Sequence, residues 1–405
     1  MLSSLLPLAE DKMSNCKNMD GKPLRILMIT PFFSPNIGGV ETHLDDLCEY
    51  LRKRGHRIFV ITYQPLMTRR KARGLEVKKG MVIRRIDWFG YGLFDKLEPY
   101  PLFEVMYLFP ALYLRTLLFT LFNRKRVDTI LTHGLVASLV GKLVKPIFRK
   151  RIVATVHTIY YLNTRPLLGR IFAWILGSYD KVLFVSERIR REFMHFGIAS
   201  SKTVVFTYWA DHTRFKPLVK GQVKEMLGWD GKFIVLFVGR LIKEKGVDVF
   251  IKTARMTDKN IFYAVITSGS YDEFKRMVGS NIPSNVIYVG PVEYSKLHLY
   301  YNAADIFVLP SQYREGFSRA VLEAALCGTP VVASNICCLP EVVDLSIGKL
   351  VDPTPENFAK VITYYYIHHD ELERLSRTCA EYAQKHFTES NARVVEESYY
   401  AQMVN

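Results

Sequence analysis

Short apolar runs alternate with amphipathic helical patterns along the first part of the chain. The run Leu24–Thr30 contains no helix or strand breaker and is typical of a buried strand. A proline- and glycine-rich loop follows, then a helical pattern with aliphatic residues on one face between Val40 and Leu51, then a second apolar run at Arg57–Thr62. Strand, loop, helix and strand within about forty residues make a βαβ unit, which predicts a parallel sheet.

The same rhythm continues in two series. The first series predicts further strands at residues 129–132, 152–156 and 181–185. After a less regular connector, the second series predicts strands at residues 233–239, 263–267, 286–289, 306–309 and 330–333. We therefore expect an α/β fold with two tandem Rossmann-like, doubly wound domains that face a central cleft, where the carboxyl ends of both sheets would bind a ligand.

The predicted domain organisation follows from these two series. Residues 1–20 are expected to form a disordered leader, 21–210 an N-terminal Rossmann-like domain, and 211–386 a C-terminal Rossmann-like domain. Residues 387–405 are expected to form a C-terminal helix that packs back on the N-terminal domain. A length of 405 residues with 49% hydrophobic residues suits two packed cores.

Composition and local signals exclude several classes of protein. The 25 Phe, 23 Tyr and 4 Trp exclude a disordered chain, and the mean hydropathy is +0.05. The six cysteines include no C-x-x-C pair, so we expect reduced thiols in a cytoplasmic protein. The first residues lack the basic stretch of a signal peptide. Residues 97–123 are interrupted by Glu104, Pro110 and Arg115, whereas a spanning helix needs about 17–25 apolar residues, so none is expected.

Positive charge is concentrated in the N-terminal half. Residues 1–200 hold 32 Lys and Arg against 16 Asp and Glu, whereas the remainder holds 55 − 32 = 23 basic and 39 − 16 = 23 acidic residues. Such a field attracts nucleic acid, a phosphorylated substrate or an anionic membrane. No nucleic-acid recognition motif accompanies the charge, so that partner is not expected. The positive charge, together with the aromatic-rich segment 100–122, favours peripheral attachment of the protein to the inner face of a membrane. The alternative is that this segment is a core helix and that the charges only keep the protein soluble.

The most specific motif follows the predicted strand at residues 306–309. It contains the pair Glu315 and Glu323 and ends in a Gly-Thr-Pro entry to the next strand. We expect a helix to open after Glu315, so that free N–H groups of its first turn, at about Gly316 to Ser318, form an anion site for a diphosphate. Glu323, two turns into that helix, would accept hydrogen bonds from a vicinal diol such as a ribose. An isolated pair of this kind is more often a solvated helix face or a set of helix caps.

A second motif, Gly239–Gly246, lies at another strand-to-helix turn. Its Arg240 and Lys245 stand on one short loop and could clamp a pair of phosphates. Taken alone, the loop could equally be an ordinary solvated basic turn.

Together these motifs resemble those of the retaining glycosyltransferases of family 4, which have the GT-B fold. The resemblance extends from about Leu24 to Phe387 and also includes Gly38–Glu41 and Gly328–Ala333. It implies transfer of a hexosyl group from a nucleotide-diphosphate sugar to a sugar or lipid-linked acceptor, with no metal and no other cofactor. It also implies that residues 21–210 form the acceptor-binding domain and residues 211–386 the nucleotide-sugar-binding domain. The absence of an Asp-x-Asp pair and of a His/Cys cluster at ligand spacing agrees with a metal-independent reaction.

The resemblance also implies roles for individual residues. Arg240 and Lys245 would hold the diphosphate and offset charge on the leaving group, while Glu315 and His157 would face the donor sugar. The residues expected to bind the donor are Gly38, Gly39, Arg240, Lys245, Glu315, Gly316, Phe317, Ser318 and Glu323. Gly38 and Gly39 are expected in a loop that approaches the ligand closely, which only glycine permits. His133 and Ser186 also follow predicted strands, and we expect structural roles for both.

Two segments depart from the family pattern. Tyr208–Asp211 stands where relatives often have Asn-Gly before the aspartate, and Cys337–Glu341 stands where they often have Gly-Gly before Pro-Glu. Both departures leave the donor base and sugar open. The alternatives to a transferase are a nucleotide-sugar epimerase of the same fold and a non-catalytic partner subunit of a transferase.

Overall fold

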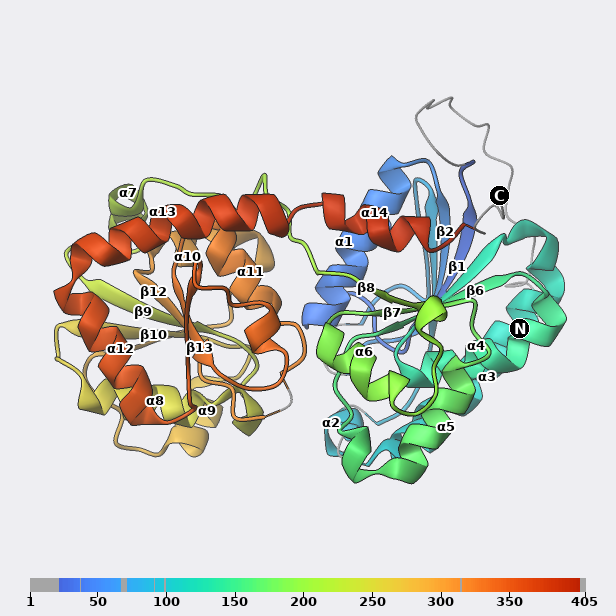
Figure 1. Ribbon diagram of the computed structural model, residues 1–405, viewed down its shortest axis with the longest axis horizontal. Coiled ribbons are helices and arrows are strands. Elements are labelled where there is room, and N and C mark those ends of the chain that lie inside the picture. The colour runs from blue at the N-terminus through green and yellow to red at the C-terminus, as the bar shows by residue number, and fades with distance from the viewer. Residues whose placement is uncertain are drawn as a thin grey trace. The chain divides into compact units, whose positions relative to one another are not determined.

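The computed structural model describes residues 22–36, 38–66, 71–90, 92–97, 100–313 and 315–400. The predicted leader at residues 1–20 lies outside the described residues. The chain divides into two compact units: unit 1 comprises residues 1–206 and 392–405, and unit 2 comprises residues 207–391. Each unit contains one sheet of mostly parallel strands with helices around it, so the predicted α/β class with two doubly wound sheets is confirmed (Figure 1).

The sheet of unit 1 has the strand order β3-β4-β2-β1-β5-β6-β7-β8, and only β3 is antiparallel to its neighbour. Its strands are β1 (Arg25–Ile29), β2 (Arg57–Tyr63), β3 (Leu75–Lys78), β4 (Met81–Ile86), β5 (Thr129–His133), β6 (Arg151–Val156), β7 (Lys181–Phe184) and β8 (Thr203–Val205). Its helices are α1 (Gly39–Lys53), α2 (Leu93–Leu97), α3 (Pro101–Asn123), α4 (Leu135–Phe148), α5 (Pro166–Leu176), α6 (Glu187–Met194) and α14 (Ser390–Glu397).

The edge strands of unit 1 were not predicted. The edge strand β3 forms a hairpin with β4 around Gly80, and their sequence LEVKKGMVIRR carries five charged residues, at positions 76, 78, 79, 84 and 85. Because an edge strand is covered on fewer sides, polar residues are tolerated there, and the apolar run that marks a central strand is missing. The pairing of β1 with β2 and β5 buries Ile26–Ile29 completely, which is why these strands were predictable.

The long apolar helix α3 continues through Pro110. One face packs on unit 1 through buried Leu108, Leu112 and Phe119, whereas Leu102 and Met106 are among its exposed apolar side chains. By length and composition Leu102–Arg126 could cross a membrane: its mean hydropathy reaches 1.6, and 33% of that window is buried. The interruptions noted in the sequence therefore do not break this helix, although a core helix of a soluble protein meets the same criteria.

The sheet of unit 2 is entirely parallel, with the order β11-β10-β9-β12-β13-β14. Its strands are β9 (Phe233–Val238), β10 (Ile261–Ile266), β11 (Val286–Gly290), β12 (Ile306–Leu309), β13 (Val331–Ser334) and β14 (Gly348–Val351). Its helices are α7 (Lys220–Met226), α8 (Val247–Met256), α9 (Tyr271–Val278), α10 (Leu297–Ala303), α11 (Arg319–Leu326), α12 (Pro355–Ile367) and α13 (His369–His386). All predicted strands of this unit are present, and the short edge strand β14 is an addition.

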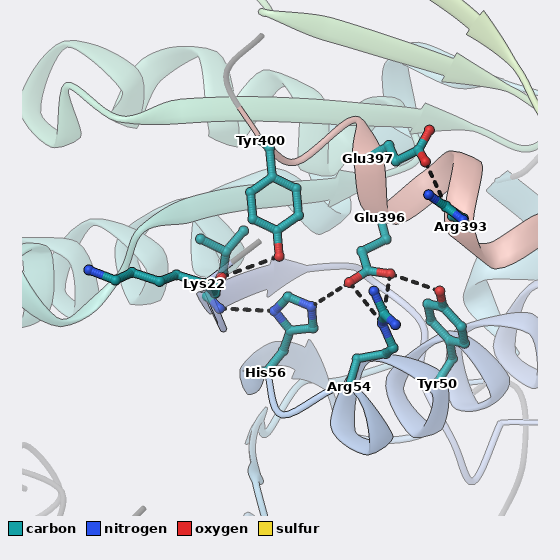
Figure 2. Close-up of polar contacts among 9 residues, drawn as sticks. Lys22, Tyr50, Arg54, His56, Arg393, Glu396, Glu397 and Tyr400 are labelled. Atoms are coloured by element: carbon teal, nitrogen blue, oxygen red, sulfur yellow. Dashed lines mark hydrogen bonds and ion pairs between the residues drawn. The ribbon is translucent and has the colours of Figure 1, made fainter. Parts of the chain in front are cut away.

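The C-terminal helix α14 belongs to unit 1 and is held there by a buried glutamate. Glu396 accepts hydrogen bonds from Tyr50 (2.7 Å) and His56 (2.9 Å) and pairs with Arg54 (3.2 Å). Figure 2 shows these side chains converging on the Glu396 carboxylate from α1 and the start of β2. The His56 ring nitrogen Nδ1 accepts from the Leu24 amide, so its Nε2 carries the proton that is donated to Glu396.

Candidate active site

Both sequence motifs of unit 2 lie at the point where the strand order of its sheet reverses. The chain runs from β9 to β10 and β11 on one side, whereas β12, β13 and β14 lie on the other side of β9. Loops that leave β9 and β12 therefore diverge from neighbouring strand ends, and ligands of open α/β sheets bind at such a switch point. The loop after β9 contains Arg240 and Lys245, and the loop after β12 contains Glu315.

Lys245 and Glu315 form a direct salt bridge across these two loops. The Lys245 Nζ lies 2.9 and 2.8 Å from the two carboxylate oxygens of Glu315. The Ser311 hydroxyl donates a third hydrogen bond, of 2.6 Å, to Oε2. Glu315 is 5% exposed, whereas the Lys245 side chain is 21% exposed. The carboxylate is therefore satisfied within the protein, and the ammonium keeps one side open.

Tight backbone packing fixes the two loops against each other. Gly246 has φ +69°, and a Cβ there would lie 1.9 Å from the Pro310 carbonyl oxygen, so only glycine fits. The Gln312 amide donates to the Glu244 carbonyl at 2.8 Å. The Lys245–Glu315 pair is consequently held by main-chain contacts on both sides rather than by the flexible side chains alone.

Arg240 stands on the same loop as Lys245 and is half-buried. Within the described part of the chain, its guanidinium has neither a hydrogen-bond acceptor nor an ion-pair partner. Because Lys245 and Glu315 neutralise each other, Arg240 gives this edge of the sheet a net positive charge. An anion bound here would gain charge-assisted hydrogen bonds from a planar donor group.

The expected first helical turn at Gly316–Ser318 was wrong. α11 begins at Arg319, and Ser318 is its N-cap residue in extended conformation, without a side-chain capping bond. Gly316 and Phe317 precede the helix and lie in neither a helix nor a strand, and the Phe317 ring packs edge-on against Tyr208 with centroids 5.2 Å apart. Any amide groups that an anion reaches first are therefore those around the N-terminus at Arg319.

Glu323 lies just over one turn into α11, not two turns, because the helix starts later than expected. It is 4% exposed, and its two oxygens accept hydrogen bonds from Tyr294 and Tyr301, each at 3.1 Å. The Arg319 Nε lies 3.6 Å away, and the same guanidinium donates to Trp209 O and Tyr294 Oη at 2.9 Å. Burial, and then the Glu323 charge, raise the pKa of Tyr301 well above its usual value.

The cysteine segment that departs from the family pattern lies beside Glu315. The Cys338 amide donates to the Glu315 carbonyl at 3.3 Å. Cys337 has φ +50°, a left-handed conformation that favours glycine, and both cysteines are buried. Side chains therefore occupy a position next to the salt bridge where glycine would leave open space.

In unit 1 the glycine pair lies at the start of a helix, so its placement in an open loop was wrong, whereas its close approach to the donor stays a prediction. Gly39 is the first residue of α1, and Gly38 is its N-cap, whose carbonyl accepts from the Thr42 amide at 3.1 Å. A Cβ on Gly38 would lie 2.2 Å from the Glu41 carboxylate, because that buried side chain folds back over the helix start. A side chain at Gly38 would therefore displace the Glu41 carboxylate from this position.

His157 follows β6 and pairs with His133 at the end of β5. Their Nε2 and Nδ1 atoms are 3.0 Å apart and the rings stack with centroids 5.3 Å apart. Burial lowers the pKa of His157 to about 3, and burial together with His157 lowers the pKa of His133 well below its usual range. Both rings are therefore neutral at pH 7, and one donates its single proton to the other.

Other residues of the site could not be found from the sequence. Tyr294, Tyr301 and Ser311 give no pattern, whereas the spacing of Arg319 four residues before Glu323 on one helix is a usable signal. Ser186 is the N-cap of α6, as its structural interpretation required, with Oγ accepting from the Ile189 amide at 3.2 Å. Among the described residues no three His, Cys, Asp or Glu side chains are grouped as metal ligands.

Two family models match the chain, one for each half. Residues 37–214 match the model described as Glycosyltransferase Family 4, and residues 220–386 match the model described as Glycosyl transferases group 1. The first ends and the second begins close to the division between units 1 and 2.

Similar proteins and structures point in the same direction. The chain is 25% identical over 398 residues to a D-inositol 3-phosphate glycosyltransferase of Saccharomonospora viridis, with 90% of each chain covered. It is 23% identical to a component of the phosphatidylinositol N-acetylglucosaminyltransferase of Arabidopsis thaliana, covering 84% of this chain and 73% of the relative. HepE of Anabaena in complex with UDP matches with a TM-score of 0.72 at 18% identity, covering 93% of this chain and 99% of HepE. Sucrose-phosphate synthase of Thermosynechococcus elongatus matches with a TM-score of 0.75 at 20% identity, covering 93% and 98%. Structural likeness at such identities establishes a shared fold.

Proposed function

The chain belongs to the GT-B glycosyltransferases of the family 4 and group 1 type, and we propose that it transfers a hexosyl group from a nucleotide-diphosphate sugar to an acceptor hydroxyl. The observation that carries this proposal is the Lys245–Glu315 salt bridge at the switch point of unit 2, with Arg240 on the same loop and unpaired among the described residues. A crystal structure of HepE with UDP-glucose, which has the same fold, supports a nucleotide-sugar donor.

The proposed role of the cations is to bind the donor diphosphate and stabilise the leaving group. Arg240 would pair with phosphate oxygens, and the open side of Lys245 would do so while its other side stays on Glu315. As the glycosidic bond breaks, negative charge grows on the terminal phosphate, and positioned cations stabilise it more than the bound substrate. Because these two cations would stabilise the leaving phosphate, we propose that the reaction needs no metal ion or other cofactor.

Glu315 has a proposed role in orienting the donor sugar. Its carboxylate is held by Lys245 and Ser311 on one side, so it is rigid before the substrate arrives. Sugar hydroxyls would donate to its remaining lone pairs. Retention of the anomeric configuration, and the contact of His157 with the sugar, stay proposals that rest on the family resemblance.

We also propose that the acceptor is lipid-linked or carries an inositol group, and that unit 1 attaches to an anionic membrane from the cytoplasmic side. Among the relatives are an α-galactosylglucosyldiacylglycerol synthase and a component of a phosphatidylinositol N-acetylglucosaminyltransferase, whose names give such acceptors. The positive charge of unit 1 and the exposed apolar side chains of α3 support the attachment. Flotation should recover more protein with anionic than with neutral vesicles, and equal recovery would exclude it.

A donor panel tests the proposed function directly. UDP-, GDP-, ADP- and dTDP-sugars are added separately, and the thermal midpoint is measured. A donor at about 100 times its Kd adds about 2.7 kcal/mol of stability, which is easily detected. The donor that shifts the midpoint is then incubated with phosphatidylinositol and with free inositol phosphate, and glycosylated product is measured by mass spectrometry.

The same experiment separates the alternatives. A nucleotide-sugar epimerase would convert the donor into an isomeric nucleotide sugar without an acceptor. A non-catalytic partner subunit would bind a donor, or nothing, and give neither product. Transfer to an added acceptor is expected, and its absence with every donor and acceptor would contradict the proposal.

A further inference from the structure

A second concentration of positive charge lies at the amino edge of the unit 1 sheet. A groove of about 830 Å³ is lined by Lys142, Lys145, Pro146, Arg149, Lys150, Arg151, Ser178 and Asp180. Arg151 begins β6, whereas His157 follows the end of the same strand. A strand of six residues is about 20 Å long, so this groove is far from the strand ends where His133 and His157 meet.

Part of this charge is anchored by the protein itself. The Lys145 Nζ lies 3.1 Å from Asp180, and the Arg151 Nε donates to the Ser398 carbonyl at 3.0 Å. Lys142 donates to the Trp174 carbonyl at 2.7 Å and lies 3.6 Å from the centre of its ring. These three side chains are therefore positioned, and only one of them forms a salt bridge with a carboxylate.

Arg149 and Lys150 supply the surplus charge. Both are exposed, and neither side chain donates a hydrogen bond or forms a salt bridge within the part of the chain that the structure describes, although the Arg149 backbone amide donates to the Lys145 carbonyl at 2.8 Å. Lys150 acts on Asp128 through its charge only, and that carboxylate is already paired with Arg25 at 2.8 Å. With five cationic side chains and one carboxylate in its lining, the groove holds a net charge of about +4 at neutral pH. Like charges so close together repel each other, and a bound anion would relieve that repulsion.

The backbone of Arg149 gives an independent sign of function. Arg149 ends α4 in the left-handed conformation, with φ +53° and ψ +33°, at a position where glycine is strongly favoured. A side chain there costs of order 1 kcal/mol. This strained conformation is a second reason, besides the charge, to look for a function of Arg149.

We propose that this groove binds a phosphate-bearing group with two or more negative charges, at a site separate from the donor site of unit 2. The group would rest between the Arg149 and Lys150 side chains and the anchored cations below them. Its chemistry is shared by the headgroup of an anionic phospholipid and by a soluble polyphosphate. The proposal does not depend on sugar transfer.

Calorimetry with inorganic tripolyphosphate tests the groove. The full chain carries Arg240→Ala and Lys245→Ala, so that the donor site does not contribute. Arg149→Gly in this background is expected to weaken binding about tenfold, since one charge-assisted hydrogen bond is lost. It should also raise the thermal midpoint by about 2–4 °C, because the strain disappears.

Two matched variants show whether the position or only the charge matters. Arg149→Lys keeps the charge and the strained backbone, so it should bind nearly as well as the parent and show no gain in thermal midpoint. Arg124→Ala removes an exposed arginine elsewhere in unit 1 and should leave tripolyphosphate binding unchanged. Equal affinity in Arg149→Gly and its parent, or equal weakening by Arg124→Ala, would overturn the proposal.

Vesicles identify the source of the phosphate. Phosphatidylcholine vesicles with and without phosphatidic acid are floated with Arg149→Gly/Lys150→Ala and with Arg124→Ala/Lys125→Ala. A several-fold loss confined to the groove variant assigns the site to a lipid headgroup; tripolyphosphate binding without that loss assigns it to a soluble polyanion. If neither tripolyphosphate nor the vesicles bind, the proposed anion site in the groove is wrong. If the groove binds its probe but no donor in the panel shifts the thermal midpoint, only the proposed function is wrong.

Discussion

The buried glutamates Glu315 and Glu396 each pair with a cation, but they lie at opposite edges of their sheets. Glu315 meets Lys245 at the carboxyl edge of the unit 2 sheet, where β9 and β12 end. Glu396 meets His56 and Arg54 at the amino edge of the unit 1 sheet, where β2 begins. Both carboxylates are almost fully buried, at 5% and 4% exposure, so burial alone does not separate their roles.

The surroundings do separate them. Glu396 lies on α14, and its partners come from α1 and the turn before β2, so its contacts join the two ends of unit 1 (Figure 2). Around Glu315, the cation keeps an open side and a further arginine, Arg240, has no protein partner among the described residues. A buried ion pair whose charges are balanced by neighbouring protein groups stabilises the fold. A buried ion pair that lies beside an unpaired cation at a switch point is suited to bind an anion.

The largest expected effect is on turnover. Lys245→Ala and Glu315→Ala should each lower kcat/KM by about 10²–10³. Lys245→Ala removes a cation that stabilises the charge developing on the leaving phosphate, and Glu315→Ala removes the carboxylate that orients the donor sugar. Glu396→Gln should leave kcat/KM within about threefold at temperatures where the protein is folded. Initial rates with the donor found in the panel check this.

Lys243→Ala is the matched control for the loop. Lys243 is exposed on the same short loop, two residues before Lys245, and should not affect transfer. If Lys245→Ala and Glu315→Ala retained wild-type rates, or if Lys243→Ala lost as much as they do, the assignment of the site to this salt bridge would be wrong.

The sequence predicts the framework of this site better than its contacts. The strand ends after β9 and β12 could be predicted because both strands are continuous apolar runs, and their loops carry the residues of recognisable motifs. The start of α11 was placed too early, although Ser318 is a serine, a preferred N-cap residue, and is the N-cap of this helix. Side chains that depend on tertiary packing, such as Tyr294 and Tyr301 on Glu323, leave no local trace.

Long-range polar contacts of unit 1 were equally hidden. The contact between His56 and Glu396 joins residues 340 positions apart, and no periodicity relates them. His133 and His157 were each placed at a strand end, but the pairing of β5 with β6 is what brings their rings together. This contact could have been predicted from the expected parallel sheet, because neighbouring parallel strands end at the same edge and residues that follow them lie close together.

The next largest effect is on the acid stability of unit 1. Burial raises the pKa of Glu396, but hydrogen bonds from His56 and Tyr50 and the Arg54 charge lower it more, to about 2. The unfolded carboxyl titrates near 4.5, so this stabilisation is complete above about pH 4.5 and is lost as the pH falls toward 2. Glu396→Gln should cost about 2–3 kcal/mol at pH 7 and progressively less below pH 4.5.

Denaturant unfolding at pH 7, 4.5 and 3 measures this difference. Glu397→Gln is the control on the same helix, since its 62% exposed side chain pairs with Arg393 at the surface. Surface pairs of this kind contribute about 0.5 kcal/mol or less. A Glu396→Gln penalty that stayed constant across the three pH values would show that the carboxylate charge is not what anchors α14.

A smaller effect concerns the neutral histidine pair. The pKa values of His133 and His157 are both lowered, so the unfolded chain binds protons more readily than the folded one below about pH 6.5. Folding stability therefore falls as the pH drops from 7.5 to 5.5. His133→Gln should reduce that fall by about 1 kcal/mol, because one buried neutral imidazole no longer opposes protonation. An unchanged fall would mean that His133 titrates normally.

The smallest expected effect decides how Glu323 can meet a nucleotide. Tyr294 is only partly buried, and its hydroxyl donates to Glu323 Oε1, whereas Tyr301 is fully buried and donates to Oε2. If a ribose hydroxyl takes the place of Tyr294 on Glu323, Tyr294→Phe removes a competitor and should bind the nucleoside diphosphate equally well or up to about threefold more tightly. Tyr301→Phe leaves a buried carboxylate oxygen without its donor and should weaken both stability and binding. Weaker nucleotide binding in Tyr294→Phe than in Tyr301→Phe would mean that the tyrosine hydroxyl itself is part of the nucleotide site, and that Glu323 acts by positioning it.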